Sequence, residues 1–321
     1  EAAGIAGTTE PGARQLFKSL KEKFLTLPDY VQVWPGHGAG SACGKALGAV
    51  PSTTVGYERR FAWWADYLAK DDEAGFVKAL LSGQPEAPSY FAQMKRLNRD
   101  GMPILGDLRD PHLLTPEQFQ QKLAQGALLV DTRDKFAFAG GHLPGSLNIP
   151  AGKHFSTWAG WMLPYERDLV LLARPERVRE LFTQLIRIGL DRVVGYIPGL
   201  EGYAQGELKT VPQLTAAEAK SLWEKGEAAI LDVRGADEYQ ASHIPGAQNL
   251  HAGRVMQHLE RIPKDRPVVL HCLGGDRSST AISALMSAGF TNLINLTGGI
   301  RAWQQEGFPL EKGPAREAVA T

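Results

Sequence analysis

The stretch that decides the fold of the second half of the chain is PVVLHCLGGDRSSTA, residues 267–281. Its apolar residues 268–271 predict an inner strand, and a helix is predicted over Ser278–Ser287. Between the two, Gly274 and Gly275 form a tight loop. A strand, a short glycine loop and a helix in this order are typical of a parallel α/β unit.

A cysteine lies where this strand ends. The backbone N–H groups of the loop and the N-terminus of the next helix would face the sulfur of Cys272, and both favour negative charge. Arg277 adds a fixed cation. These influences stabilise a thiolate over a thiol, so Cys272 is predicted to be a nucleophile or to hold an anionic group. The alternative is a small buried apolar residue, as most lone cysteines are.

From residue 114 onward the sequence repeats itself with a period of about 100 residues. LVDTR at 129–133 returns as ILDVR at 230–234, and GHLPG at 141–145 returns as SHIPG at 242–246. Several such anchors in one order indicate two copies of one unit. Each copy is predicted to be a parallel α/β domain, with strands at 127–130, 169–172 and 193–196 and again at 228–231, 268–271 and 293–296.

Composition narrows the class of protein. The chain has 321 residues with 43% hydrophobic residues, which predicts two or three globular domains. Lys+Arg 35 balances Asp+Glu 35, which argues against broad nucleic-acid binding. The sequence has no apolar run long enough to cross a membrane and no export signal. With only Cys43 and Cys272, we predict a cytoplasmic protein with reduced thiols; its oligomeric state is open, a homo-oligomer included.

Over roughly residues 211–312 the chain resembles the rhodanese family. The resemblance is carried by DVR at 232–234, HIPGA at 243–247, the loop at 272–277 and TGGIRAW at 297–303. It implies a sulfurtransferase in which Cys272 attacks the outer sulfur of a donor, carries it as a persulfide and passes it to a thiophilic acceptor. The implied partners are small thiols and sulfane-sulfur donors such as thiosulfate, glutathione persulfide or similar persulfides.

The predicted catalytic residues are Cys272 and Arg277, and the predicted substrate-binding residues are those of the surrounding loop: Leu273, Gly274, Gly275, Asp276 and Ser278. Four residues separate Cys272 from Arg277, whereas related phosphatase loops have five there to surround a tetrahedral phosphate. The shorter loop suits a single extra sulfur atom. Around it, Asp232 and Arg234 are predicted to pair or to cap within the fold, and His271 to be a packed histidine.

Asp276 bears on the choice of donor. With one anion beside the cation of Arg277, the loop predicts that low-molecular-weight persulfides compare favourably with thiosulfate, which is helped by excess positive charge. The alternative is that Asp276 points to solvent or caps the following helix.

The first copy lacks the nucleophile. On the repeat register Leu172 stands where the second copy has Cys272, and residues 109–207 contain no cysteine. We therefore predict that the first copy keeps the fold and has a structural role, either docking the active domain or positioning a partner.

Residues 30–59 carry a second resemblance. VWPGHGAGSACG at 33–44 and PSTTVGYER at 51–59 are similar to the C-terminal half of a metallo-β-lactamase-fold domain, in the branch of persulfide dioxygenase-like proteins that continues into two rhodanese units. The principal metal ligands of that fold lie upstream, and here His37 alone corresponds to the last ligand histidine. We expect no cofactor in this chain, with iron only if a parent protein has the N-terminal metal-binding half. Cys43 is either a small residue in a turn or a second thiol in a sulfur relay.

Together these observations predict an α/β protein of two tandem rhodanese-like parallel-sheet domains preceded by a partial metallo-β-lactamase-fold (αββα) segment. The expected domains are 1–108, with the partial domain and a linker; 109–208, the inactive copy; and 209–321, the active copy. Two other functions stay open: a metal-dependent persulfide dioxygenase or hydrolase, if an upstream half exists, and a non-catalytic scaffold.

Overall fold

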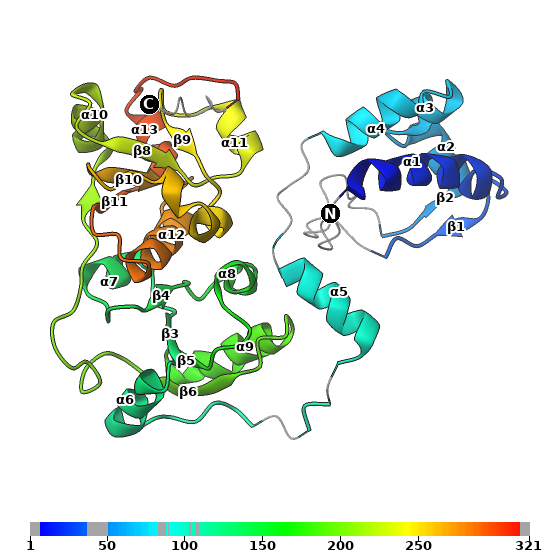
Figure 1. Cartoon of the computed structure of the whole chain (residues 1–321). Helices are drawn as coiled ribbons and strands as arrows, with labels where there is room; N and C mark the ends of the chain where they lie inside the picture. The colour runs from blue at the N-terminus through cyan, green and yellow to red at the C-terminus, as the bar shows by residue number, and fades with distance from the viewer. Residues whose placement is uncertain are drawn as a thin grey trace. The chain divides into compact units, whose positions relative to one another are not determined.

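The computed structural model describes residues 7–36, 51–82, 88, 90–102, 104–106 and 109–314 (Figure 1). The chain divides into two compact units, residues 1–95 and 96–321. His37 and Cys43 lie outside the described residues, so the expectations for them stay predictions. None of the described helices is both long enough and apolar enough to cross a membrane.

The N-terminal unit is built around two helices. Helix α1 (Thr9–Ser19) continues as a π-helical segment to Phe24, and its apolar face packs against α4 (Glu73–Leu81). Phe17 contacts Phe76 edge-on, with ring centroids 5.3 Å apart. The other elements are the antiparallel strands β1 (Gln32–Val33) and β2 (Thr53–Thr54) and the helices α2 (Val55–Phe61) and α3 (Ala65–Ala69).

One helix forms where the proline-rich sequence suggests only a linker. Helix α5 (Tyr90–Asp100) has Pro88 before it and Pro103 after it. Because a proline disrupts a helix from within but is tolerated at its ends, eleven residues free of proline suffice for a helix. Part of the stretch expected to hold the linker is therefore helical, and the positions of the prolines limit where that helix can begin and end.

Each repeat contains one parallel sheet, which confirms the α/β prediction. The strand order is β4-β3-β5-β6 in the first repeat and β9-β8-β10-β11-β7 in the second, and every neighbouring pair is parallel. The strands of the first are β3 (Leu128–Asp131), β4 (Leu147–Asn148), β5 (Leu169–Leu172) and β6 (Val193–Ile197). Those of the second are β7 (Gln213–Leu214), β8 (Ala229–Asp232), β9 (Gln248–Asn249), β10 (Val268–His271) and β11 (Leu293–Leu296).

Helices cover both sheets. The first repeat has α6 (Pro116–Ala124), α7 (Lys135–Gly140), α8 (Phe155–Met162) and α9 (Pro175–Ile186). The second has α10 (Ala216–Glu224), α11 (Ala236–Ala241), α12 (Asp276–Ser287) and α13 (Gly299–Gln305), with 3-10 segments at Ala252–Gln257 and Leu259–Arg261. Thr115 and Thr215 begin the first helix of each repeat with the same capping box, so the repetition extends to single hydrogen bonds.

A buried ion pair recurs at the same place in both sheets. Arg234 forms a bidentate pair with Asp232 and also donates to the carbonyl of Ser242. Arg133 does the same with Asp131 and the carbonyl of Gly141 in the first repeat. These contacts satisfy buried charges and tie strand end to loop, which confirms the predicted pairing of Asp232 with Arg234.

The two repeats share an interface centred on α12, which lies between β10 of its own sheet and β4 of the first repeat (Figure 1). The backbone N–H of Asn148 donates to Ser283 Oγ at 2.9 Å, and Ser279 Oγ donates to Asn148 Oδ1 at 2.8 Å. Phe138 of the first repeat belongs to the same buried cluster as Cys272. The helix that follows the cysteine loop therefore rests on the first repeat.

A close contact in this interface gives a stability test. A Cβ atom placed on Gly253 would lie 2.3 Å from ring atoms of Trp161 in the first repeat. We expect Gly253→Ala to lower the free energy of unfolding of the paired repeats by about 1–3 kcal/mol through overpacking. Thermal and urea unfolding measure the change.

The matched control is Gly199→Ala, because a Cβ atom there meets nothing within 4 Å. We expect that variant to stay within about 0.5 kcal/mol of the wild type. Equal stability of the two variants would contradict the interface described here.

Candidate active site

The sulfur of Cys272 is held by the loop that joins β10 to α12. The strand ends at His271 and the helix begins at Asp276, so Cys272 is the first residue of a short connection. The residue is 2% exposed. The Gly275 N–H donates to Cys272 Sγ at 3.1 Å. The Ser278 hydroxyl donates a hydrogen bond to Asn295 Oδ1 at 2.6 Å and lies 3.8 Å from the same sulfur.

The helix starts two residues earlier than the sequence predicted. Asp276 and Arg277 belong to its first turn, and Gly275 is the N-cap with φ +103°. Residues other than glycine rarely adopt that backbone conformation, so the backbone requires a glycine at this position. The left-handed turn aims the Gly275 N–H back at the sulfur.

Helix α13 supports the loop from a second direction. The N–H of Ile300 donates to the carbonyl of Cys272 at 2.9 Å, and the N–H of Arg301 donates to the carbonyl of Leu273 at 3.3 Å. A Cβ atom on Gly299 would lie 2.4 Å from the Cys272 carbonyl oxygen. The glycine therefore permits the close approach by which the start of α13 fixes the backbone of the nucleophile.

Arg277 forms an ion pair with a carboxylate that the sequence analysis did not single out. Both terminal nitrogens of Arg277 donate to Glu238, the third residue of α11. Burial disfavours the charged form of Glu238, but the hydrogen bonds and charge of Arg277 outweigh it and keep the pKa of Glu238 below its usual value. Arg277 is thus half of an ion pair at the pocket wall, and its partner is Glu238, whereas the sequence analysis placed only the anion of Asp276 beside it.

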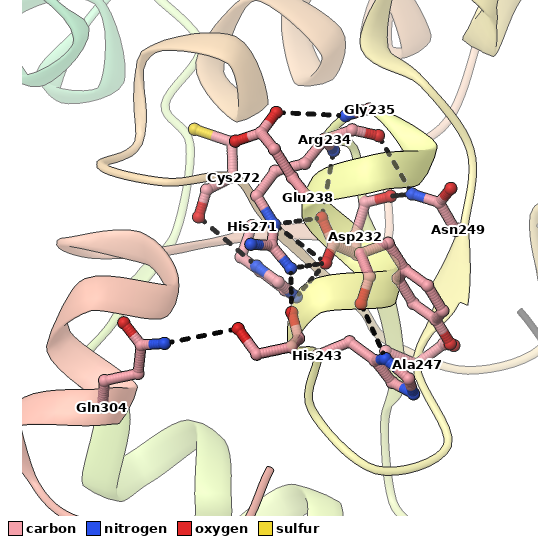
Figure 2. A network of polar contacts seen from close by, with 12 residues as sticks. Asp232, Arg234, Gly235, Glu238, His243, Ala247, Asn249, His271, Cys272 and Gln304 are labelled. Atoms are coloured by element: carbon pink, nitrogen blue, oxygen red, sulfur yellow. Dashed lines mark hydrogen bonds and ion pairs between the residues drawn. The ribbon is translucent and has the colours of Figure 1, made fainter. Parts of the chain in front are cut away.

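Beneath the cysteine lies a buried polar network, drawn in Figure 2. It joins the Asp232–Arg234 pair to Asn249, whose amide donates to the carbonyls of both residues. His271 is fully buried beside it, with Nε2 3.7 Å from Asp232 Oδ2. Burial lowers the pKa of His271, so the ring is neutral at pH 7 and packs as predicted.

The cysteine opens into a pocket of about 680 Å³ whose walls come from both repeats. The second repeat supplies Glu238, Cys272, Leu273, Gly274, Asp276, Arg277, Thr280 and Arg301, and the first supplies Pro150, Ala151, Gly152, Lys153, His154, Thr157 and Trp158. Three of the five predicted loop residues, Leu273, Gly274 and Asp276, line this pocket together with Arg277. The other two are absent from the lining: Gly275 donates to the sulfur, and Ser278 lies beside it. The wall from the first repeat was missed because its residues are far from the loop in sequence.

The carboxylate of Asp276 does not act as a free anion in this pocket. It lies 3.1 Å from Lys135 Nζ of the first repeat, and that ammonium also donates to the Gly274 carbonyl at 2.6 Å. The Asp276 side chain is 70% exposed, so it does point to solvent, as one alternative expected, but it does so while paired with a lysine. The expectation that it caps α12 is wrong, because Gly275 is the N-cap and no side chain in the described part of the chain caps the helix. The sequence argument counted only the charges of the loop, whereas Lys135, Lys153 and Arg301 add three cations around it.

The first repeat has no comparable loop. Leu172 pairs with Asp131 in the sheet, as His271 pairs with Asp232, so the residue equivalent to Cys272 is Ala173. The prediction of Leu172 was wrong by one residue because the spacing of the repeat changes between its anchors. Helix α9 begins at Pro175, two residues after Ala173, whereas α12 begins four residues after Cys272. The absence of the nucleophile thus goes with a shorter loop.

Among the residues that the structure describes, no group of three or more His, Cys, Asp or Glu side chains is arranged to hold a metal ion. His37, the one residue that the second resemblance assigns to a metal, lies outside them. No step of the chemistry below uses a metal.

Comparisons with known proteins agree with the geometry. The model of the Rhodanese-like domain matches residues 115–205 and 215–306. A "Sulfurtransferase" of Allochromatium vinosum is 38% identical over 81 residues, which are 25% of this chain and 76% of the relative. The "Thiosulfate sulfurtransferase GlpE" of Coxiella burnetii is 32% identical over 92 residues, 29% of this chain and 86% of the relative.

One solved structure is similar over a longer stretch. It is titled "Metallo-beta-lactamase from Staphylococcus aureus subsp. aureus COL", with 39% identity, a TM-score of 0.48 and coverage of 60% of this chain. The chain spans only 52% of that protein. The two family matches take up more than half of the 321 residues, and they coincide with the two parallel sheets. The chain belongs to the rhodanese-like domain family, with two tandem copies of the domain.

Proposed function

We propose that the second repeat is a rhodanese-type sulfurtransferase that moves sulfane sulfur from a persulfide or thiosulfate donor to a thiol acceptor through a persulfide on Cys272. The observation that carries the proposal is the placement of Cys272 Sγ on the pocket, with the Gly275 N–H 3.1 Å away. Sulfurtransferase names among the relatives support the general activity. A free thiol in this role suits a reducing compartment such as the cytoplasm.

The reaction proceeds in two balanced steps. The Cys272 thiolate attacks the outer sulfur of the donor, a new S–S bond forms, and the old one breaks with its electron pair leaving on sulfite or on the donor thiolate. An acceptor thiolate then attacks the outer sulfur of the Cys272 persulfide, and the Cys272 thiolate leaves. No net oxidation occurs in either step, so no further oxidant or reductant is required.

The chain assists both steps with preorganised positive charge. Cys272 leaves the second step as an anion, and a persulfide is itself anionic near neutral pH. The Gly275 N–H and the N-terminus of the twelve-residue helix α12 point toward this negative charge. The Arg277–Glu238 pair and α13 keep the loop in place, so little reorganisation is needed between the two forms of the cysteine.

The pocket walls indicate an anionic donor or acceptor. Lys153 and Arg301 line the pocket, and the exposed carboxylate of Asp276 is paired with Lys135. The argument against thiosulfate counted only Asp276 and Arg277, so these additional cations weaken the reason to disfavour this donor. We propose that the pocket takes thiosulfate as well as carboxylate-bearing persulfides of the size of glutathione persulfide.

A persulfide dioxygenase or hydrolase would require metal ligands beyond those that the structure describes, so it stays a proposal for a longer parent protein. The non-catalytic scaffold is less well supported, because a scaffold has no need for a cysteine bonded to a loop N–H at the base of a pocket.

Replacing the nucleophile tests the proposal. In Cys272→Ser the hydroxyl is nearly isosteric but does not ionise near neutral pH, so sulfur transfer should fall by roughly 100-fold or more. Thiosulfate and glutathione persulfide serve as donors, with release of sulfite or glutathione as the readout. Cys43→Ser, the other cysteine variant, is the control and shows whether Cys43 takes part in a relay. Transfer that survives in Cys272→Ser would refute the assignment.

Restoring a cysteine to the first repeat should not restore activity. Ala173 is the equivalent position, but only Arg174 separates it from α9, and Pro175 has no N–H to offer a sulfur. We expect Ala173→Cys, made in a Cys272→Ser background, to gain no sulfur on incubation with either donor. Intact-mass measurement shows the outcome, and a stoichiometric persulfide on the new thiol would overturn the argument from loop length.

A further inference from the structure

A lysine of the first repeat reaches into the cysteine loop of the second. Lys135 is the first residue of α7, and its side chain is 18% exposed. Its Nζ donates to the Gly274 carbonyl oxygen at 2.6 Å and lies 3.1 Å from Asp276 Oδ1. The residue at the equivalent place in the second repeat is Ala236, the first residue of α11, so this lysine is not a feature of the repeated fold.

The bonded carbonyl belongs to the peptide unit that also bonds the sulfur. The carbonyl of Gly274 and the N–H of Gly275 are two ends of one planar trans peptide, so they point in opposite directions. One end meets Lys135 Nζ at 2.6 Å and the other meets Cys272 Sγ at 3.1 Å. The orientation that satisfies the lysine is therefore the orientation that presents the N–H to the sulfur.

Two glycines make this peptide easy to rotate. Neither Gly274 nor Gly275 has a side chain to restrict its dihedral angles, and rotation by half a turn would aim the carbonyl oxygen at the sulfur. The carbonyl oxygen is the negative end of the peptide dipole, so in that orientation it would repel an anionic thiolate or persulfide. A cation bonded to the carbonyl opposes that rotation and also polarises the N–H, which strengthens its bond to sulfur.

We propose that Lys135 is a positioning residue through which the first repeat keeps the Gly274–Gly275 peptide turned toward Cys272 and so favours the anionic form of the sulfur. The proposal rests on the proposed function of Cys272, and it gives the first repeat, which has no nucleophile, a role in the chemistry of that cysteine. Asp276 assists by holding the ammonium group. Arg277 cannot replace the lysine, since its terminal nitrogens are bonded to Glu238.

A purely structural role would predict something different. If Lys135 only joined the two repeats, its loss would lower stability and leave the pH dependence of the cysteine unchanged. If only its charge mattered, loss of another pocket cation would have a similar effect. Lys153 lines the same pocket and, in the part of the chain that the structure describes, is not bonded to the loop.

The experiment measures the rate of alkylation of Cys272 by iodoacetamide as a function of pH, in a Cys43→Ser background that leaves one thiol. Lys135→Met keeps the apolar stem and removes the charge and the donors. We expect the midpoint of its profile to move up by about one pH unit, so that alkylation at pH 7 slows roughly 10-fold. The profile of Lys153→Met should keep the wild-type midpoint. The midpoint of Lys135→Arg should lie close to the wild-type value, because arginine is also a cationic donor.

Several results would overturn the proposal. A Lys135→Met profile that superimposes on the wild type excludes positioning, and an equal shift in Lys153→Met assigns the effect to charge alone. Lys135→Gln is a second neutral variant that must shift in the same direction; failure of both neutral variants to fold would make the residue structural. Because alkylation needs no sulfur donor, these outcomes are separate from a failure of the wild type to transfer sulfur, which would refute the proposed function instead.

Discussion

The site depends on one hydrogen bond, from the Gly275 N–H to the sulfur of Cys272 at 3.1 Å. A neutral thiol gains little from such a donor, whereas a thiolate or a persulfide gains more, because the acceptor is then charged. Three parts of the fold maintain the bond. Strand β10 ends at His271, directly before the cysteine, and the left-handed Gly275 is the N-cap of α12. Backbone N–H groups of α13 donate to the carbonyls of Cys272 and Leu273. Residue type is restricted at two of these positions, because Gly275 has a φ of +103° and a Cβ atom on Gly299 would collide with the Cys272 carbonyl oxygen.

The repeat without a nucleophile is joined to this loop by polar contacts as well as by packing. Asn148 bonds two serines of α12, Lys135 bonds the loop that precedes the helix, and Lys153 and Trp158 complete the pocket wall. The first repeat has the same parallel sheet and the same Asp–Arg pair at Asp131 and Arg133 as the second, but its short connection after Ala173 has no comparable loop to bind a sulfur.

Much of the fold and the core of the site are readable from the sequence because they are local. The strands of both repeats, the cysteine at a strand end and the glycine loop follow from a few adjacent residues. What escaped prediction depends on residues far apart. Glu238 pairs with Arg277, which lies 39 residues later in the sequence, and Lys135 donates to the carbonyl of Gly274, 139 residues later. Leu172 was misaligned by one because a fixed repeat spacing ignores the difference in loop length, whereas the sheet register fixes Ala173.

The most direct test of the account is to locate the transferred sulfur. The protein is incubated with thiosulfate or glutathione persulfide, treated with an alkylating agent to trap persulfides, digested, and mapped by mass spectrometry. The account predicts one extra sulfur atom on the peptide that contains Cys272, and its loss when an acceptor thiol is added before alkylation. An alkylated Cys272 without extra sulfur, under conditions in which the protein turns over the donor, would contradict it.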